Sequence, residues 1–211
     1  MVVWLVVVGL MIALAYGTRA ASGKPDPNVL YQWSTVAGTL IQDGFILFLV
    51  LAIAGFSRRL LALRRPNGYW RALRTVGIAL VVVYVFEVVY SHLTHPGNEQ
   101  GLTPEHWEPR HAAAYVANAA AICLWVPFVE ELTYRGLGYT LLKRFGRWPA
   151  IVAVGVLFGL AHGLIIELPV IVAFGCVLAW IRSQTNSVVP GMVLHGAFNL
   201  IALVAAVTIQ R

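Results

Sequence analysis

Ionisable and amide side chains interrupt three otherwise apolar stretches of this sequence. They are Glu130, Glu131, Arg135, His162, His195 and Asn199. Carboxylates and imidazoles exchange protons near neutral pH, and they can activate a water molecule as a nucleophile. A charged side chain near the centre of a bilayer costs roughly 2.5–3.5 kcal/mol on insertion scales. Their placement in apolar stretches therefore predicts a buried functional site.

The segment 130–135 predicts separate roles for its two glutamates. In a helix, where successive residues are about 100° apart, Glu131 and Arg135 lie on nearly one face and can form an ion pair. Glu130 then points about 140° away from Arg135 and is the carboxylate left for chemistry. Pro127 is expected to kink this helix and to free backbone groups close by. The alternative interpretation is a solvated helix end.

The histidines also lie at helical spacing from a second group. Phe158 precedes His162 by four residues, and His195 precedes Asn199 by four residues, so each pair shares a helix face. His195 and Asn199 can both donate hydrogen bonds to one acceptor. The alternatives are a histidine at a helix interface for the first pair and polar helix–helix contacts for the second.

The depths of these residues favour one shared site. At about 1.5 Å per residue, Glu130 lies about 20 Å from Lys143, and His162 lies about 20 Å from Arg147. His195 lies only about 10 Å into its own apolar stretch by the same measure. Unrelated polar residues need not share a depth, so the agreement of the first two favours a common pocket.

The composition predicts how these residues are held. Hydrophobic residues make up 59% of the 211 positions and charged residues 11%, against about 25% charged residues in a soluble domain. This excludes a soluble enzyme, a disordered tail and a fibrous chain. The apolar runs are long and do not alternate, which favours helices over a lipid-facing β-barrel. The expected fold is an all-α polytopic membrane bundle with about seven transmembrane helices.

The expected spans follow the apolar runs. They are residues 1–16, 34–56, 76–90, 111–128, 149–162, 168–181 and 188–209. Residues 1–110 are expected to supply N-terminal spans and loops, and residues 111–211 a catalytic core, within one continuous membrane domain. Cys123 and Cys176 lie inside apolar runs without a C-x-x-C spacing, so they are interpreted as small core residues.

The positive charge indicates an orientation. Lysine and arginine exceed aspartate and glutamate by 15 to 9, a net charge of +6. Six arginines fall between two spans: Arg58, Arg59, Arg64, Arg65, Arg71 and Arg74. Basic loops mark the cytoplasmic side, which predicts a multi-pass protein of the cell membrane with a cytoplasmic N-terminus. Lys143, Arg144, Arg147 and Arg182 fall on the same side in this topology. No nucleic-acid partner is expected, because no recognition module accompanies the charge.

Three motifs in order resemble a known family. They are Glu-Glu-x-x-x-Arg at 130–135, Phe-x-x-x-His at 158–162 and His-x-x-x-Asn at 195–199. This set resembles the CPBP family of intramembrane proteases, which includes the type II CAAX prenyl endopeptidases and bacterial proteins linked to bacteriocin processing and self-immunity. The motifs and their helices cover roughly residues 112–205, and the first hundred residues match only as additional spans.

The resemblance implies a glutamate-dependent endopeptidase acting on a membrane-associated protein or peptide in the lipid bilayer. By motif position, Glu130 is the general base on water, assisted by His162. His195 and Asn199 correspond to the oxyanion hole. The supporting positions are Glu131, Arg135 and Phe158. Such groups are effective: a positioned base contributes about 10²–10⁴ to the rate and one oxyanion donor about 10²–10³.

Three alternatives remain open at this stage. Glu130, His162 and His195 are residue types that zinc accepts, so a zinc-dependent protease is the runner-up to a cofactor-free mechanism, which is preferred because H-E-x-x-H spacing is absent. A non-catalytic membrane chaperone, immunity or scaffold protein could use the same bundle. A transporter could use Asp43 and Glu87 as a proton path, although the short chain lacks repeats. Both of these acids are expected to face the bundle interior.

Overall fold

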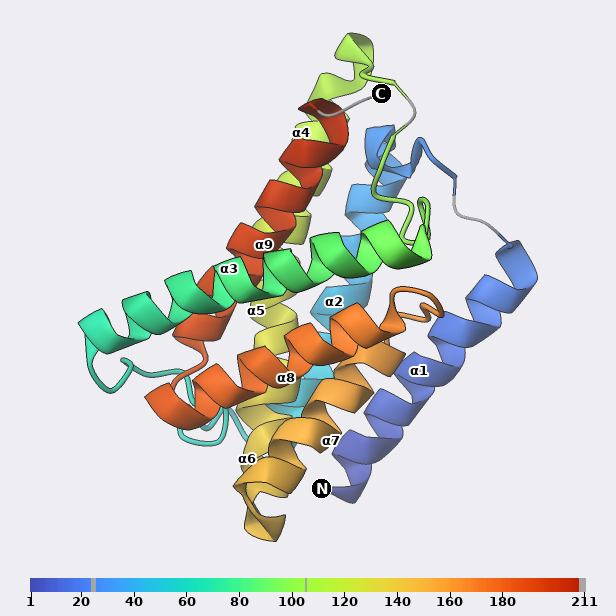
Figure 1. The fold of residues 1–211 in the computed structure, drawn as a ribbon. Helices are drawn as coiled ribbons and strands as arrows, with labels where there is room; N and C mark the ends of the chain where they lie inside the picture. The colour runs from blue at the N-terminus through green and yellow to red at the C-terminus, as the bar shows by residue number, and fades with distance from the viewer. Residues whose placement is uncertain (24–25, 105, 209–211) are drawn as a thin grey trace.

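The computed structural model describes residues 1–23, 26–104 and 106–208. Within these residues the regular elements are all helical (Figure 1). The α-helices are α1 Val2–Ser22, α2 Trp33–Ala54, α3 Tyr69–Thr94, α4 Ala112–Ala120, α5 Val126–Glu130, α6 Tyr139–Leu142, α7 Arg147–Leu160, α8 Leu168–Thr185 and α9 Val189–Thr208. Short 3-10 turns occupy Val29–Tyr31, Pro109–His111 and Lys143–Phe145, and π-helical turns occupy Ala121–Trp125 and Glu131–Gly138. The expectation of an all-α polytopic bundle is confirmed.

Six helical segments in the described residues are long and apolar enough to cross a membrane. They are Val2–Ser22, Trp33–Ala54, Tyr69–Thr94, Pro109–Phe145, Leu168–Thr185 and Val189–Thr208. The remaining expected span, 149–162, corresponds to α7, which has 14 residues and is about 21 Å long. It is shorter than a crossing requires. The chain turns beyond Leu160, where Gly163 takes φ 65° against the backbone of Ala15.

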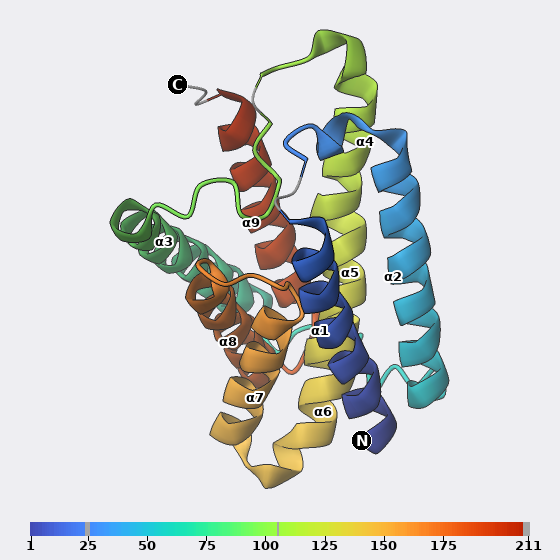
Figure 2. The same ribbon diagram turned by 90° about the vertical axis from the view of Figure 1, so that its right-hand side faces the viewer.

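The segment Pro109–Phe145 runs as one helical column through α4, α5 and α6 (Figure 2). Proline has no backbone N–H and cannot complete the regular α-helical ladder. The π-helical turn Ala121–Trp125 ends just before Pro127. The helix therefore continues through Pro127 without interruption. The second wide turn begins at Glu131, next to Glu130. π-Helical turns often occur at functional sites.

Several close helix crossings depend on glycines. A Cβ at Gly155 would overlap Cys176 of α8, and a Cβ at Gly196 would overlap the Cys123 carbonyl of the π-helical turn. These positions bring α7 onto α8, which lie antiparallel in Figures 1 and 2, and α9 onto the long column. Small residues allow such approach in membrane bundles.

The N-terminal helices share the core of the later ones. Trp4 of α1 is fully buried, and its indole N–H donates a 3.0 Å hydrogen bond to the Thr133 carbonyl. Its ring fills the space beside Gly138. The main hydrophobic cluster therefore joins both halves of the chain. By contrast, α1, α2 and α3 present exposed apolar side chains outward, among them Val2, Ile41 and Val81, as expected for surfaces that face lipid.

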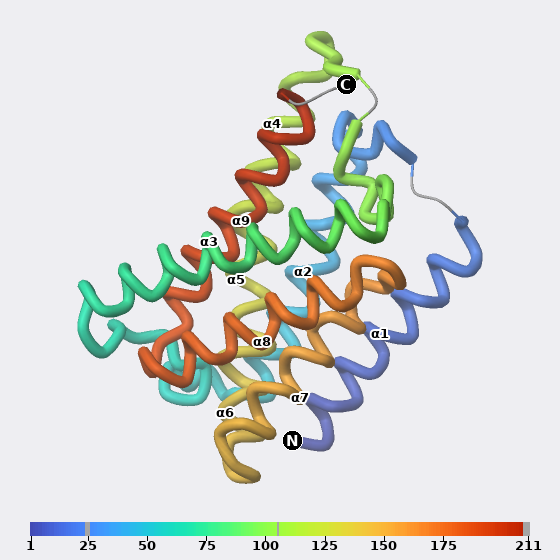
Figure 3. Tube along the Cα trace, viewed as in Figure 1, coloured from blue at the N-terminus to red at the C-terminus, as the bar shows by residue number. Residues whose placement is uncertain are grey.

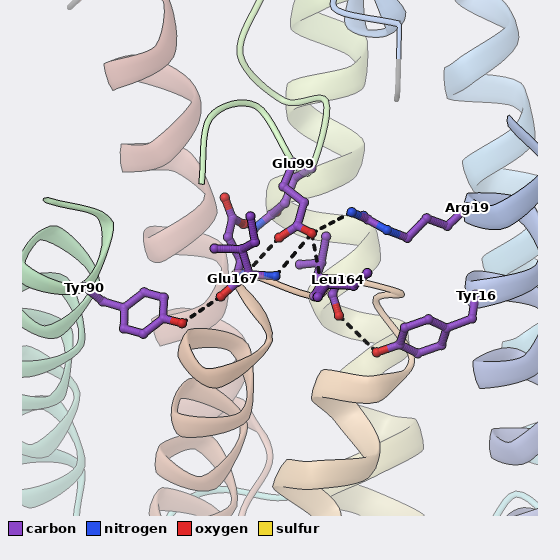
Figure 4. Close-up of polar contacts among 9 residues, drawn as sticks. Tyr16, Arg19, Tyr90, Glu99, Leu164 and Glu167 are labelled. Carbon is purple, nitrogen blue, oxygen red and sulfur yellow. Dashed lines mark hydrogen bonds and ion pairs between the residues drawn. The ribbon is translucent and has the colours of Figure 1, made fainter. Parts of the chain in front are cut away.

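A loop after α3 is fastened to the turn between α7 and α8 (Figure 4). The carboxylate of Glu99 accepts hydrogen bonds from the backbone N–H groups of Ile165 (2.9 Å) and Glu167 (2.8 Å), and from Arg19 (2.7 Å). Burial opposes ionisation of Glu99, but the backbone donors and Arg19 hold its pKa below its usual range. The hydroxyl of Tyr16 adds a 3.0 Å bond to the Leu164 carbonyl. These contacts hold the α7–α8 turn near His162.

Candidate active site

Glu131 and Arg135 form the ion pair that their spacing predicts. The Nη1–Oε1 distance is 3.0 Å and both side chains are fully buried. The Arg135 guanidinium lies 4.0 Å from the centroid of the Phe158 ring and donates to the Gly175 carbonyl at 3.1 Å. Glu131 packs against Gly191, where a Cβ would overlap its carboxylate. The pair therefore connects the long column to α7, α8 and α9.

Glu130 faces two imidazoles instead of Arg135. Its Oε1 lies 3.9 Å from His162 Nε2, and its Oε2 lies 3.6 Å from His195 Nε2. The Glu130 side chain is 19% exposed, His162 is 26% exposed and His195 is 4% exposed. The three groups come from the end of α5, the turn after α7 and the first half of α9. The structure brings together these three residues of the predicted site.

Each imidazole has a second polar neighbour, and for His162 this neighbour fixes the orientation of the ring. His162 Nδ1 lies 2.8 Å from the Phe158 carbonyl, and because a carbonyl only accepts, this nitrogen carries the proton. In the neutral ring, His162 Nε2 is then an acceptor directed at Glu130. His195 Nδ1 lies 3.6 Å from Glu131 Oε1. The His195 ring therefore lies between the two glutamates.

Phe158 forms the apolar centre of this cluster. It is fully buried, and its ring lies edge-on to His162 at 4.6 Å, to His195 at 5.8 Å and to Tyr134 at 5.3 Å between centroids. The shared face of Phe158 and His162 follows from their spacing. The packing of Phe158 on His195, from another helix, did not follow from spacing.

Asn199 points its amide nitrogen at the backbone. Asn199 Nδ2 donates a 2.8 Å hydrogen bond to the carbonyl of Ile122 in the π-helical turn. In a π-helical turn, each carbonyl accepts a hydrogen bond from the N–H five residues later. The donor for the Ile122 carbonyl would be residue 127, but Pro127 has no N–H. His195 and Asn199 thus share a face of α9, but one amide hydrogen of Asn199 is used in the bond to Ile122.

Two further ionisable residues, Asp43 and Tyr134, were not assigned to the site from the sequence. Asp43 of α2 is 7% exposed, and α2 packs against α5, the helix that ends at Glu130. Tyr134 is fully buried and its hydroxyl has no partner within the described residues. Its separation of four residues from Glu130 could have indicated the proximity. The position of Asp43 depends on how α2 packs.

Two cavities beside the loop after α3 are each lined by one residue of the predicted site, and the lining of neither includes Glu130 or His195. His162 lines a pocket of about 450 Å³, and Asn199 and Glu87 line another of about 800 Å³. Gln100 and Leu102 line both pockets. In residues 1–23, 26–104 and 106–208, no group of three or more His, Cys, Asp or Glu side chains has a metal-binding arrangement.

Comparison with known proteins places the motifs in a family. Residues 112–201 match the family described as type II CAAX prenyl endopeptidase Rce1-like. Searches of curated proteins and of solved structures each found no match. The matched segment begins with α4 and contains all three motifs. The chain therefore carries a domain of the Rce1-like type II CAAX prenyl endopeptidase family, the CPBP family, over residues 112–201.

Proposed function

We propose that this protein is an intramembrane endopeptidase that hydrolyses a peptide bond of a membrane-associated protein or peptide. The observation that carries the proposal is the position of the Glu130 carboxylate, 3.9 Å from His162 Nε2 and 3.6 Å from His195 Nε2. The family match and the six candidate spans support a protease whose substrates are membrane proteins. The bilayer is the cell membrane, with the basic loops and the N-terminus in the cytoplasm.

Glu130 and His162 are suited to activate water. Their 3.9 Å separation exceeds a direct hydrogen bond, and a water between two polar groups at such a separation can bond to both. Since His162 Nε2 and the Glu130 carboxylate are both acceptors, one water would donate to both. Attack of its oxygen on the substrate carbonyl transfers a proton to Glu130. When the C–N bond breaks, that proton passes to the leaving nitrogen, giving an amine and a carboxylic acid.

His195 and Asn199 are suited to stabilise the oxyanion. The tautomer of His195 that carries its proton on Nε2 has an N–H to donate. Asn199 has two amide hydrogens, and the bond to Ile122 uses one of them. The second is available to the oxygen of the tetrahedral intermediate. Glu131 and Arg135 serve as support, because their charges neutralise each other in the core.

The test compares membrane peptides from cells that express the wild-type protein, Glu130→Ala or Glu130→Gln. We expect a set of cleavage products that depends on Glu130 and disappears in both variants. Glu108→Gln, at an exposed loop position, is the matched control and retains the products. Thermal unfolding in detergent confirms that each variant is folded. Full product formation by folded Glu130→Gln would refute the assignment of the base.

A further inference from the structure

One end of the molecule carries most of the positive charge and no acidic residue. This basic end consists of residues 56–74, 139–148 and 182–189, where α2, α6 and α8 end and α3, α7 and α9 begin. Ten of the fifteen lysines and arginines fall in these segments, and none of the nine acids does. A surface that gathers ten positive charges attracts anions from outside the chain.

A pocket of about 560 Å³ at the basic end gathers three of these charges. Its lining consists of Tyr139, Thr140, Leu141, Lys143, Arg144 and Arg147. Arg147 donates from Nε to the Ser183 hydroxyl at 3.2 Å, which ties the α6–α7 turn to α8. The hydroxyl of Thr140 has no hydrogen-bond partner within the described residues. The pocket thus offers three cations and free donor capacity, and these are the groups that bind phosphate.

Arg182 gives an independent indication of a missing anion. It is 2% exposed, and its guanidinium lies 5.4 Å from the centroid of Tyr139, a residue that lines the pocket. Its Nη1 donates to Asn186 at 3.2 Å, but Nε and Nη2 have no partner within the described residues. Arg64 donates to the same Asn186 oxygen and adds positive charge. A buried charge without a counter-ion is destabilising, so an anion at this place would stabilise the structure.

The surroundings of the pocket place it at the level of lipid headgroups. Phe145 and Trp148, on either side of Arg147, are 59% and 62% exposed. Exposed aromatic residues at the ends of spans are typical of the membrane–water interface. The α6–α7 turn that carries them lies at the lower end of the molecule, near the N-terminus (Figure 3).

We propose that the pocket formed by Tyr139, Thr140, Lys143, Arg144 and Arg147, backed by Arg182, binds the phosphate of an anionic phospholipid headgroup. An anionic lipid fits better than a zwitterionic one because the three segments of the basic end contain no Asp or Glu to attract a choline or an amine. The bound phosphate would place a negative charge beside the α6–α7 turn and α8. The proposal is independent of proteolysis.

The test measures lipid binding to the full chain in detergent by native mass spectrometry. Phosphatidylglycerol, phosphatidylcholine and inorganic phosphate are the three probes. Lys143→Gln combined with Arg144→Gln removes two charges from the pocket. Arg58→Gln combined with Arg59→Gln is the matched control, because it removes two exposed charges from the basic end but outside the pocket lining.

We expect the pocket variant to bind phosphatidylglycerol about a hundredfold more weakly, since it loses two charge-assisted contacts and each is comparable to a tenfold change. The control variant and wild type should bind alike, and phosphatidylcholine should bind wild type more weakly. Equal losses of phosphatidylglycerol binding in both variants would indicate diffuse electrostatic attraction to the basic end and would overturn the proposal. Equal binding of phosphatidylcholine and phosphatidylglycerol to the wild type would also overturn it. Displacement of the lipid by equimolar inorganic phosphate would assign the pocket to free phosphate. If the double variant fails to fold, Arg144→Gln alone, at an exposed side chain, decides the question.

Discussion

The side-chain amide of Asn199 donates a 2.8 Å hydrogen bond to the backbone carbonyl of Ile122. The bond joins α9 to the π-helical turn that precedes Pro127, and it supplies the donor that the proline lacks. Gly196 makes the contact possible, because a Cβ there would overlap the neighbouring Cys123 carbonyl. The third motif therefore has a structural role in addition to the one proposed in chemistry.

The Asn199–Ile122 bond predicts a coupling between Asn199 and Pro127. Asn199→Ala should lower the free energy of unfolding by about 1–3 kcal/mol, because it leaves the partly buried Ile122 carbonyl unsatisfied. Pro127→Ala restores an N–H to the helix, so the same substitution should cost less in that background. A double-mutant cycle from denaturation in detergent measures the coupling. Additive effects would show that the proline and the amide are independent.

Glu131 and Arg135 should contribute to stability more than to the rate constant. Glu131→Gln leaves the buried Arg135 without its counter-ion, and breaking a buried pair typically costs about 3–5 kcal/mol. Thermal unfolding of the purified variant gives the measurement, with Glu130→Gln as the matched substitution one residue earlier. A slower reaction at unchanged stability would contradict the structural assignment of Glu131.

The two histidines should affect catalysis at the chemical step. His162→Ala removes the second acceptor for water and is expected to lower kcat about 10²–10⁴-fold. His195→Ala removes the proposed oxyanion donor and is expected to lower kcat about 10²–10³-fold. Each variant should retain the substrate KM within a small factor. Assays on a peptide identified from the Glu130-dependent products give these values, and a defect confined to KM would instead indicate a binding role.

Chelation distinguishes the preferred mechanism from the zinc alternative. A carboxylate that activates water without a metal should keep its full rate after treatment with a strong chelator and dialysis. The assay uses the same peptide before and after treatment, with an established zinc protease treated in parallel as a control. If chelation abolished the activity and added zinc restored it, the zinc-dependent mechanism would be favoured over the metal-free one.

Glu99 should stabilise the α7–α8 turn in a pH-dependent manner. Its folded-state pKa is below the ordinary value of 4.5, so its stabilisation is complete above that value and is lost as the pH falls through the lower folded-state pKa. Glu99→Gln should therefore increase amide hydrogen exchange at Ile165 and Glu167 at pH 7. The difference from wild type should shrink as the acid is protonated. A difference that is constant with pH would show that the charge of Glu99 is unimportant.

Local spacing in the sequence was sufficient for the long helices and for the Glu131–Arg135 pair. Apolar runs need lipid or core contact whatever their neighbours are, and two residues four apart in a helix meet because the helical repeat brings them together. The length of α7 was less predictable, since its apolar run continues beyond Leu160 while the backbone turns against Ala15. A turn of that kind depends on a contact between distant segments.

How the separate motifs meet depends on the packing of the whole bundle. His195 was expected nearer the membrane surface than Glu130, yet the tilt and close packing of α9 bring their side chains to 3.6 Å. The hydrogen-bond partner of Asn199 likewise depends on helix packing. A sequence determines which residues share one helix face through a fixed repeat. Distances between helices depend on the side chains at every crossing together, so they emerge only when the whole bundle is assembled.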